Sequence, residues 1–205
     1  MTETTAVDIL LFDKFETLDA MGPAEVFGRL PEYYRISCRS VTGGTVTSTQ
    51  GVSFVTTRFP THALAGVPGG ILLIPGGMGA RPLVRDTEFL ADLKKLCESA
   101  QYVLTVCTGS ALLARTGLLD RRRATTNKAV FGWASSQGEH VRWEKRARWV
   151  ADGKYYTSSG VSAGIDMALG FLEERHGKKT ALDTARQIEY LWNDDRENDP
   201  FAANP

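Results

Sequence analysis

The sequence predicts an α/β fold built on a mostly parallel central sheet, and three observations lead to this prediction. Short apolar runs suited to buried strands recur along the chain, the clearest being Ile71–Ile74 and Tyr102–Val106. Segments with a helical spacing of apolar residues lie between such runs, as in Thr87–Ser99. Glycine-rich turns follow the two clearest strands, at Gly76-Gly77 and at Gly109. Strands that alternate with helices are typical of parallel sheets, because every parallel connection needs a crossover.

Strands are expected wherever apolar or alternating residues run for about four to eight positions. In chain order they are Val7–Phe12, Tyr34–Val41, Ile71–Ile74, Tyr102–Cys107 and Ala124–Thr126. Two hairpins complete the set of strands. One covers Thr45–Thr57 and turns at Gln50-Gly51, and the other pairs Arg142–Val150 with Lys154–Ser158 around Asp152-Gly153, which is a strong hairpin signal.

Helices are expected between the strands, and proline or glycine marks several of their ends. Gly22-Pro23 starts the first helix, with proline at an early helical position, and Pro31 ends it. Gly117 and Gly177 end two of the later helices. These later helices are, in chain order, Thr87–Ser99, Ser110–Thr116, Asn127–Ser136, Ile165–His176 and Thr180–Trp192, and a polar, irregular tail follows from Asn193.

The composition fits one domain that spans residues 1–205. Hydrophobic residues make up 42% of the chain, and 24 Lys and Arg balance 24 Asp and Glu, so no net charge favours nucleic acid or an anionic membrane. Met1–Asp8 carries acid where a signal peptide carries base, and no apolar run approaches the roughly 20 residues that span a bilayer. Three cysteines have neither a disulfide nor a metal-site spacing. A cytoplasmic protein is expected.

Cys107 lies where the central strand passes into a helix, with Ser110 near the helix cap. A nucleophile at such a turn points outward beside free backbone N–H groups, which lower the pKa of a thiol and can hold an oxyanion. The usual elbow has glycine on both sides of the nucleophile, whereas here Gly109 follows and Thr105 precedes. A cysteine of the core explains the same pattern, because free cysteine is among the most buried residue types. Both interpretations stay open on this stretch alone.

The strands Val7–Phe12 and Ile71–Ile74 are expected to end at the same edge of the sheet as the strand before Cys107. Proteins with α/β folds bind ligands at this edge. Glycine lets the backbone approach a ligand closely, so the N–H of Gly77 joins the N–H of Thr108 as a candidate oxyanion hole. A plain tight turn is the alternative. Asp19 follows the first strand and is the candidate catalytic acid, with a helix-capping role as its alternative.

Histidine is the usual base for a catalytic cysteine, but the three histidines do not suit that role. His62, His140 and His176 each fit an exposed position, and none is adjacent to Cys107. At the end of its predicted helix, His176 suits the helix dipole. A Cys-His pair is therefore not expected, and a carboxylic acid remains as the partner.

Five segments, in order along nearly the whole chain, resemble the DJ-1/PfpI superfamily. They are Leu18–Val26, Ile74–Gly77, Val106–Ser110, Ala124–Thr126 and Gly160–Asp166. The resemblance implies a flavodoxin-like three-layer sandwich. It also implies a nucleophile at Cys107, an acid at Asp19 bonded to the sulfur, oxyanion donors at Gly77 and Thr108, and no metal or organic cofactor. Members are commonly homodimers, so a homodimer is expected.

The branch of the superfamily that this chain resembles follows from the residues around the cysteine. Protease-like and chaperone-like members place His directly after it, where this chain has Thr108. The Cys-Thr-Gly-Ser elbow with an upstream Leu-Asp-x-x-Gly-Pro resembles isocyanide (isonitrile) hydratases and the sensor domains of AraC-type regulators. A helix-turn-helix pair has no room after Trp192, so the DNA-binding half is not expected. One position departs: hydratase-like sequences commonly have His where Asn127 stands, and asparagine cannot titrate.

Three functions are therefore weighed, each on a small molecule. The first is a cofactor-independent lyase that hydrates a small electrophile, by resemblance an isonitrile that becomes an N-formamide. The second is a glyoxalase-type enzyme that acts on α-oxoaldehydes. The third is a non-enzymatic redox or electrophile sensor, in which Cys107 stops at a sulfenic or sulfinic acid.

The charge state of Cys107 is predicted jointly with that of Asp19. A carboxylate repels a neighbouring thiolate, so the two groups share one negative charge stably only while one proton stays between them. We expect Asp19 to keep this proton and Cys107 to be the thiolate at neutral pH.

Overall fold

One sheet organises the part of the chain that the structure describes, which is residues 4–59 and 69–202 of a computed structural model. Its strand order is β3-β4-β2-β1-β5-β6-β10-β9. The strands are β1 (Thr5–Leu10), β2 (Tyr34–Ser40), β3 (Gly44–Thr47), β4 (Ser53–Arg58), β5 (Ile71–Ile74), β6 (Tyr102–Thr105), β9 (Trp149–Asp152) and β10 (Tyr155–Ser158). The interior strands pair in parallel, and only the two edge strands, β3 and β9, pair antiparallel. The predicted mostly parallel sheet is confirmed.

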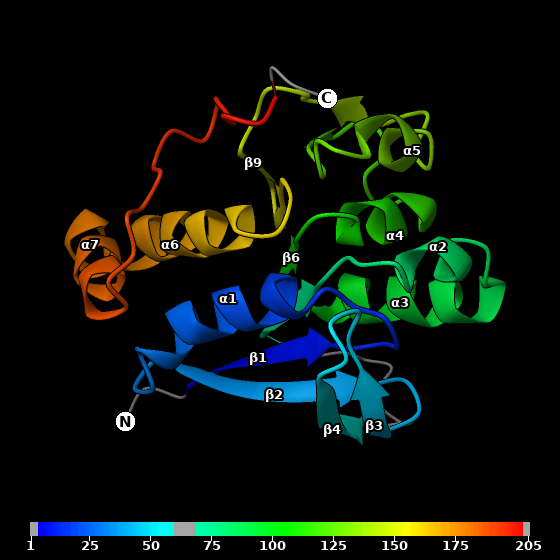
Figure 1. Cartoon of the computed structure of the whole chain (residues 1–205), viewed down its shortest axis with the longest axis horizontal. Coiled ribbons are helices and arrows are strands. Elements are labelled where there is room, and N and C mark those ends of the chain that lie inside the picture. The colour runs from blue at the N-terminus through cyan, green and yellow to red at the C-terminus, as the bar shows by residue number, and fades with distance from the viewer. Residues whose placement is uncertain (1–3, 60–68, 203–205) are drawn as a thin grey trace.

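Helices cover both faces of this sheet. They are α1 (Thr17–Gly28), α2 (Ala80–Leu83), α3 (Thr87–Ser99), α4 (Gly109–Arg115), α5 (Phe131–Ser135), α6 (Ala163–His176) and α7 (Lys178–Gln187). Helices α1, α6 and α7 pack as one group and α2, α3 and α4 as another, with β6 between α6 and α4 (Figure 1). The predicted flavodoxin-like sandwich is confirmed. Within the described ranges, no helix has the length and apolar character needed to cross a membrane.

Helix α1 begins earlier than predicted, at Thr17 instead of Gly22-Pro23, and Pro23 lies inside it. Proline removes one hydrogen bond of a helix, so the sequence pattern favours a later start. Packing against α6 compensates for that loss. A Cβ on Gly22 would lie 2.7 Å from Ile165, and a Cβ on Gly164 would lie 3.3 Å from the Pro23 ring. The two helices therefore cross at close range, and the earlier start places Asp19 in the first turn of α1.

The region after α4 departs most from the prediction. The expected helix Asn127–Ser136 shortens to α5, and the expected strand Arg142–Val150 divides. Its first part, β8 (Arg142–Trp143), pairs in parallel with β7 (Arg123–Ala124) in a small separate sheet, and its last part joins the main sheet as β9. Arg148 interrupts the alternation, because its buried side chain is held by ion pairs. The hairpin between β9 and β10 and the hairpin between β3 and β4 are confirmed.

Backbone segments approach one another very closely where β5 and β6 end. A Cβ on Gly109 would lie 2.3 Å from the carbonyl oxygen of Ile74 and 2.9 Å from that of Pro75. Because both neighbours are backbone atoms, they cannot move aside without disturbing the sheet. Glycine is therefore required at this position.

Gly109→Ala is expected to lower the free energy of unfolding by about 3 kcal/mol, because overpacking forces the backbone of two strands apart. Urea unfolding followed by circular dichroism measures this change. Gly132→Ala is the matched control, since a Cβ there meets nothing within 4 Å, and it should stay within about 1 kcal/mol of wild type. Equal stability of the two variants would contradict the close approach.

Candidate active site

Cys107 lies at a tight turn between β6 and α4. Its φ of 57° falls in the left-handed region, which costs energy for any residue except glycine. Hydrogen bonds hold the turn: the N–H of Cys107 donates to the Ser159 carbonyl at 3.0 Å, and that of Gly109 donates to Val106 at 3.0 Å. Thr108 is the N-cap of α4. The predicted elbow geometry is present, and its strain is a property that many nucleophile turns share.

Three N–H donors face the sulfur of Cys107. Nδ2 of Asn127 donates to Sγ at 3.0 Å, and the backbone N–H groups of Thr108 and Val161 also hydrogen-bond the sulfur. Oδ1 of Asn127 accepts from the N–H of Val130 at 3.2 Å, which fixes the amide with its donor side toward the sulfur. All three donors favour negative charge on the sulfur.

Asp19 reaches the same place from the first turn of α1. Its side chain is fully buried, and Oδ2 accepts a hydrogen bond from the N–H of Gly76 at 2.9 Å. The Cys107 side chain also hydrogen-bonds this carboxyl group, as the resemblance implies. Asp19 does not cap its helix, because Glu16 is the N-cap residue. Burial raises the pKa of Asp19 from an ordinary 3.8 to about 7, against the opposing effect of the Gly76 hydrogen bond.

The pKa of the Cys107 thiol is raised, like that of Asp19. Burial, followed by the charge of Asp19, raises the pKa of Cys107 to about 12, and the N–H donors only partly oppose this rise. The prediction of a raised Asp19 pKa agrees with the structure, whereas the prediction of a resting thiolate at neutral pH is wrong. The physical reason is that desolvation of the thiolate outweighs its hydrogen bonds. The resting site therefore pairs a thiol with a carboxyl group that ionises near neutrality.

The two candidate oxyanion donors, Gly77 and Thr108, lie side by side, but a hydrogen bond between them occupies the N–H of Gly77. The N–H of Gly77 donates to the hydroxyl of Thr108 at 3.0 Å, whereas the N–H of Thr108 faces the sulfur. A substrate atom reaches the N–H of Gly77 only after the Thr108 hydroxyl turns away. Ser110, expected near the cap, lies inside α4, and its hydroxyl donates to the Cys107 carbonyl at 2.9 Å.

Histidine does not enter this site from the two positions that the structure describes. His140 is exposed before β8, and Nε2 of His176 is bonded to the Tyr34 hydroxyl at 2.7 Å, at the opposite edge of the sheet. Burial lowers the pKa of His176, and its side chain is half-buried, not exposed as expected. His62 lies outside the described residues. Among those residues, no group of three His, Cys, Asp or Glu side chains could hold a metal ion.

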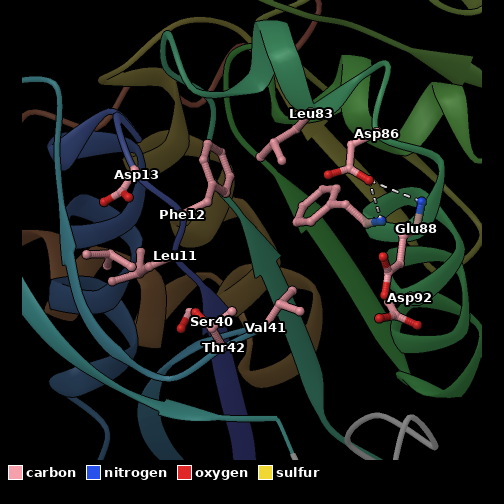
Figure 2. A pocket seen from close by; sticks show the side chains of 12 residues that line it. Leu11, Phe12, Asp13, Ser40, Val41, Thr42, Leu83, Asp86, Glu88 and Asp92 are labelled. Carbon is pink, nitrogen blue, oxygen red and sulfur yellow. Dashed lines mark hydrogen bonds between the residues drawn. The ribbon is translucent and has the colours of Figure 1, made fainter.

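Among the cavities near this edge of the sheet, two differ clearly in their relation to the sulfur. The first, about 360 Å³, has Phe12 and Leu83 pointing into it and Asp86, Glu88 and Asp92 around its rim (Figure 2). None of the residues that face the sulfur lines it. The second cavity, about 320 Å³, is lined by residues that include Asn127 and Val161, two of the sulfur's donors. The second cavity is therefore the one that adjoins Cys107.

Comparison with known proteins identifies the family. The profile of the DJ-1/PfpI family matches residues 5–174. The chain belongs to the DJ-1/PfpI family. An isonitrile hydratase from Pseudomonas putida is 33% identical over 186 residues, which cover 90% of this chain and 78% of that protein. The HTH-type transcriptional regulator CdhR from Pseudomonas aeruginosa is 31% identical over 83% of this chain, and the match spans 50% of that regulator.

A solved structure agrees with this assignment. The crystal structure of a ThiJ/PfpI family protein from Pseudomonas syringae has a TM-score of 0.82 at 27% identity and covers 99% of this chain and 80% of that chain. The predicted resemblance is thus confirmed at the level of the family. Since DJ-1/PfpI relatives include both a hydratase and a regulator, membership alone does not choose between these functions.

Sequence reasoning about this DJ-1/PfpI site misses two of the sulfur's donors. It interprets Asn127 only as the loss of a titratable histidine, and it gives the N–H of Val161 no role. The signal for Asn127 is the glycine beside it: a Cβ on Gly160 would lie 2.5 Å from Nδ2 of Asn127, so a larger residue would displace the amide. Val161 itself has a φ of 46°, in the left-handed region that β-branched residues rarely adopt.

Proposed function

We propose that this protein is a cofactor-independent lyase that hydrates an isonitrile to an N-formamide, with Cys107 as nucleophile and Asp19 as proton carrier. The observation that carries the proposal is the buried carboxyl of Asp19, whose pKa is raised to about 7 beside a thiol. A general base works best with a pKa near the operating pH. The 33% identity to a P. putida isonitrile hydratase supplies the substrate class.

In the first half of the proposed reaction, the thiol adds to the terminal carbon of the isonitrile. The carboxylate of Asp19, which is hydrogen-bonded to the Cys107 side chain, takes the proton from Sγ as the sulfur–carbon bond forms. Asp19 then delivers this proton to the same carbon, which gives a thioimidate, R–N=CH–S. The N–H donors of Asn127, Thr108 and Val161 stabilise the sulfur while it carries negative charge.

In the second half, water adds to the thioimidate carbon and the sulfur leaves. Asp19 takes a proton from the attacking water and passes it to the imine nitrogen, so the adduct is R–NH–CH(OH)–S and Asp19 is again a carboxylate. Its collapse to R–NH–CHO breaks the sulfur–carbon bond, and the hydroxyl proton returns to the sulfur by way of Asp19. The sum is one isonitrile and one water to one formamide. We assign the N–H groups of Gly77 and Thr108 to the oxygen of the adduct, once the Thr108 hydroxyl has turned away.

The rate of hydration is expected to rise with pH through about 7 and then to level off. Below pH 7 Asp19 is protonated and cannot accept the thiol proton, so kcat/KM should fall about tenfold per pH unit there. Initial rates of formamide formation between pH 5 and 9 measure this profile. A rate that is flat or falls as the pH rises through 7 would rule out Asp19 as the base.

Parallel assays with an alkyl isonitrile, methylglyoxal and dilute hydrogen peroxide test the proposal against its alternatives. We expect formamide from the isonitrile and slower turnover of methylglyoxal, because no second mobile proton carrier contacts the sulfur among the described residues. We expect slow oxidation of Cys107, because it is 6% exposed and its pKa is raised. Lactate as the dominant product, or rapid selective oxidation without turnover, would replace the hydratase with a glyoxalase-type enzyme or a sensor.

A further inference from the structure

The chain after α7 crosses the molecule and attaches to the edge strand of the sheet. This C-terminal strap, residues 188–202, runs from α7 toward β9 and α5 (Figure 1). The carbonyl of Arg196 accepts from the N–H groups of Arg148 at 2.7 Å and Trp149 at 3.3 Å, and the N–H of Asp199 donates to the Arg146 carbonyl at 2.6 Å. The strap is therefore held by backbone hydrogen bonds to the residues at the start of β9.

Arg148 anchors the strap to the active-site side of the fold. Its buried guanidinium donates from Nε and Nη2 to Oδ2 of Asp166, at 2.8 and 2.6 Å, and Nη1 lies 3.6 Å from Oδ2 of the buried Asp199 on the strap. Nη2 also donates to the hydroxyl of Ser162 at 3.3 Å, directly after Val161. One buried cation thus ties the strap to the loop that faces the sulfur.

The anchor places Phe201 at the cavity that adjoins Cys107. The N–H of Phe201 donates to Oδ1 of Asp199 at 2.8 Å, which fixes a local turn at this part of the strap. Phe201 then lines the cavity of about 320 Å³ opposite Asn127, Gly160 and Val161. Its side chain is the largest apolar group there, yet the residue is 63% exposed. A ligand that covered the ring would gain hydrophobic free energy.

The charge in this cavity is not available to a ligand. Lys128 lines the cavity, but its ammonium is buried, and Nζ donates to the Thr125 hydroxyl and to the Ala147 carbonyl, each at 2.7 Å. The remaining lining is small and uncharged. A neutral, apolar group fits these walls better than an ion does, because an ion would lose its hydration without a free partner.

We propose that this cavity receives the organic substituent of the substrate and that Phe201 forms its outer wall. The proposal rests on the proposed function for the identity of the substrate and extends it to a preference for isonitriles with bulky apolar substituents. Asn127 both lines the cavity and lies 3.0 Å from the sulfur. An isonitrile bonded to Sγ through its carbon carries its substituent on the next atom, at the mouth of the cavity. The strap then acts as a specificity element.

The first test compares cyclohexyl isonitrile with methyl isonitrile. Phe201→Ala should lower kcat/KM for the cyclohexyl compound about tenfold and change that for the methyl compound less than twofold, because only the larger group reaches the ring. Leu191→Ala is the matched control, since Leu191 lies on the same strap and is 95% exposed. An equal loss for both substrates, or no loss for either, would overturn the assignment of Phe201.

The second test does not depend on isonitrile turnover. N-cyclohexyl iodoacetamide and iodoacetamide each alkylate a thiol, with a new sulfur–carbon bond, loss of iodide and release of the thiol proton. Peptide mass spectrometry follows Cys107, with the half-buried Cys38 as internal reference. Cys107 should prefer the cyclohexyl reagent relative to Cys38, and Phe201→Ala should abolish that preference. Preference without isonitrile turnover would refute the hydratase but keep the cavity assignment, whereas no preference in wild type would refute the cavity assignment.

Discussion

Cys107→Ala is expected to abolish isonitrile hydration, lowering kcat/KM by about 10⁴-fold or more. The proposed reaction forms a sulfur–carbon bond in its first half, and no other group in the site can form it: Asp19 serves as proton carrier, and Asn127 is neutral and already bonded to the sulfur. Formamide formation followed by chromatography, with enzyme at high concentration, measures the residual rate. Cys107→Ser should be almost as inactive, because Asp19 is far too weak a base for an alcohol.

Cys38→Ala provides the control for this loss. Cys38 lies on β2, and burial raises the pKa of its thiol without any contact to the proposed site. This variant should retain wild-type turnover. If formamide production survived in Cys107→Ala and disappeared in Cys38→Ala, the reaction would take place at Cys38 and not at the proposed site.

The parts of the site that the sequence predicted are those that depend on local pattern and topology. The strand before Cys107 and the glycine after it indicate the elbow, since glycine is the only residue type that fits at position 109 beside the Ile74 carbonyl. Parallel strands bring their carboxyl ends to one edge. For that reason the sequence alone predicts that Asp19 and Gly76 lie near Cys107. The hydrogen bond of 2.9 Å from the N–H of Gly76 to Asp19 agrees with that placement.

The parts that the sequence did not predict depend on contacts between distant segments. The raised pKa of Cys107 results from burial by the whole fold, which a strand-and-turn pattern cannot measure. The amide of Asn127, which donates to the sulfur, packs against the distant Gly160, where a Cβ would lie 2.5 Å from Nδ2. The ion pair between Arg148 and Asp199 joins positions 51 residues apart in sequence (199 − 148), so neither residue stands out from its surroundings.

These long-range effects converge on Asp19, whose buried carboxyl has no cation beside it within residues 4–59 and 69–202. Its neighbours include Gly76, a neutral donor, and Cys107, whose thiolate would repel it. The equally buried Asp166 faces Arg148 at 2.6 Å, and this arginine opposes the rise in pKa that burial causes there. A buried carboxyl with a cation can stay ionised, whereas one without a cation holds its proton to a higher pH. The proton-carrying role that we propose for Asp19 therefore comes with a loss of stability above the pH at which its carboxyl group ionises.

Asp19→Asn is expected to raise the free energy of unfolding by about 4 kcal/mol at pH 8, and to raise Tm by about 10 °C. The pKa of Asp19 rises on folding from 3.8 to about 7, so its contribution to stability is fully present below about pH 4 and is lost as the pH rises through about 7. Asparagine keeps the acceptor for the Gly76 N–H and never ionises. The same variant should lose at least about 100-fold in turnover, because it cannot accept a proton.

Unfolding in urea at pH 4 and pH 8 separates this effect from a general gain in packing. The advantage of Asp19→Asn should be small at pH 4, grow between pH 4 and 7, and be complete at pH 8. Asp183→Asn is the matched control, and its effect on stability at pH 8 should have the opposite sign. Asp183 is a surface carboxylate whose pKa is lowered by Lys179, so that variant should be slightly less stable than wild type at pH 8 and equal to it at low pH. An Asp19→Asn variant that is no more stable at pH 8 than at pH 4 would mean that this carboxyl is ionised in the folded protein at acidic pH, and it could not then be the base that switches near neutrality.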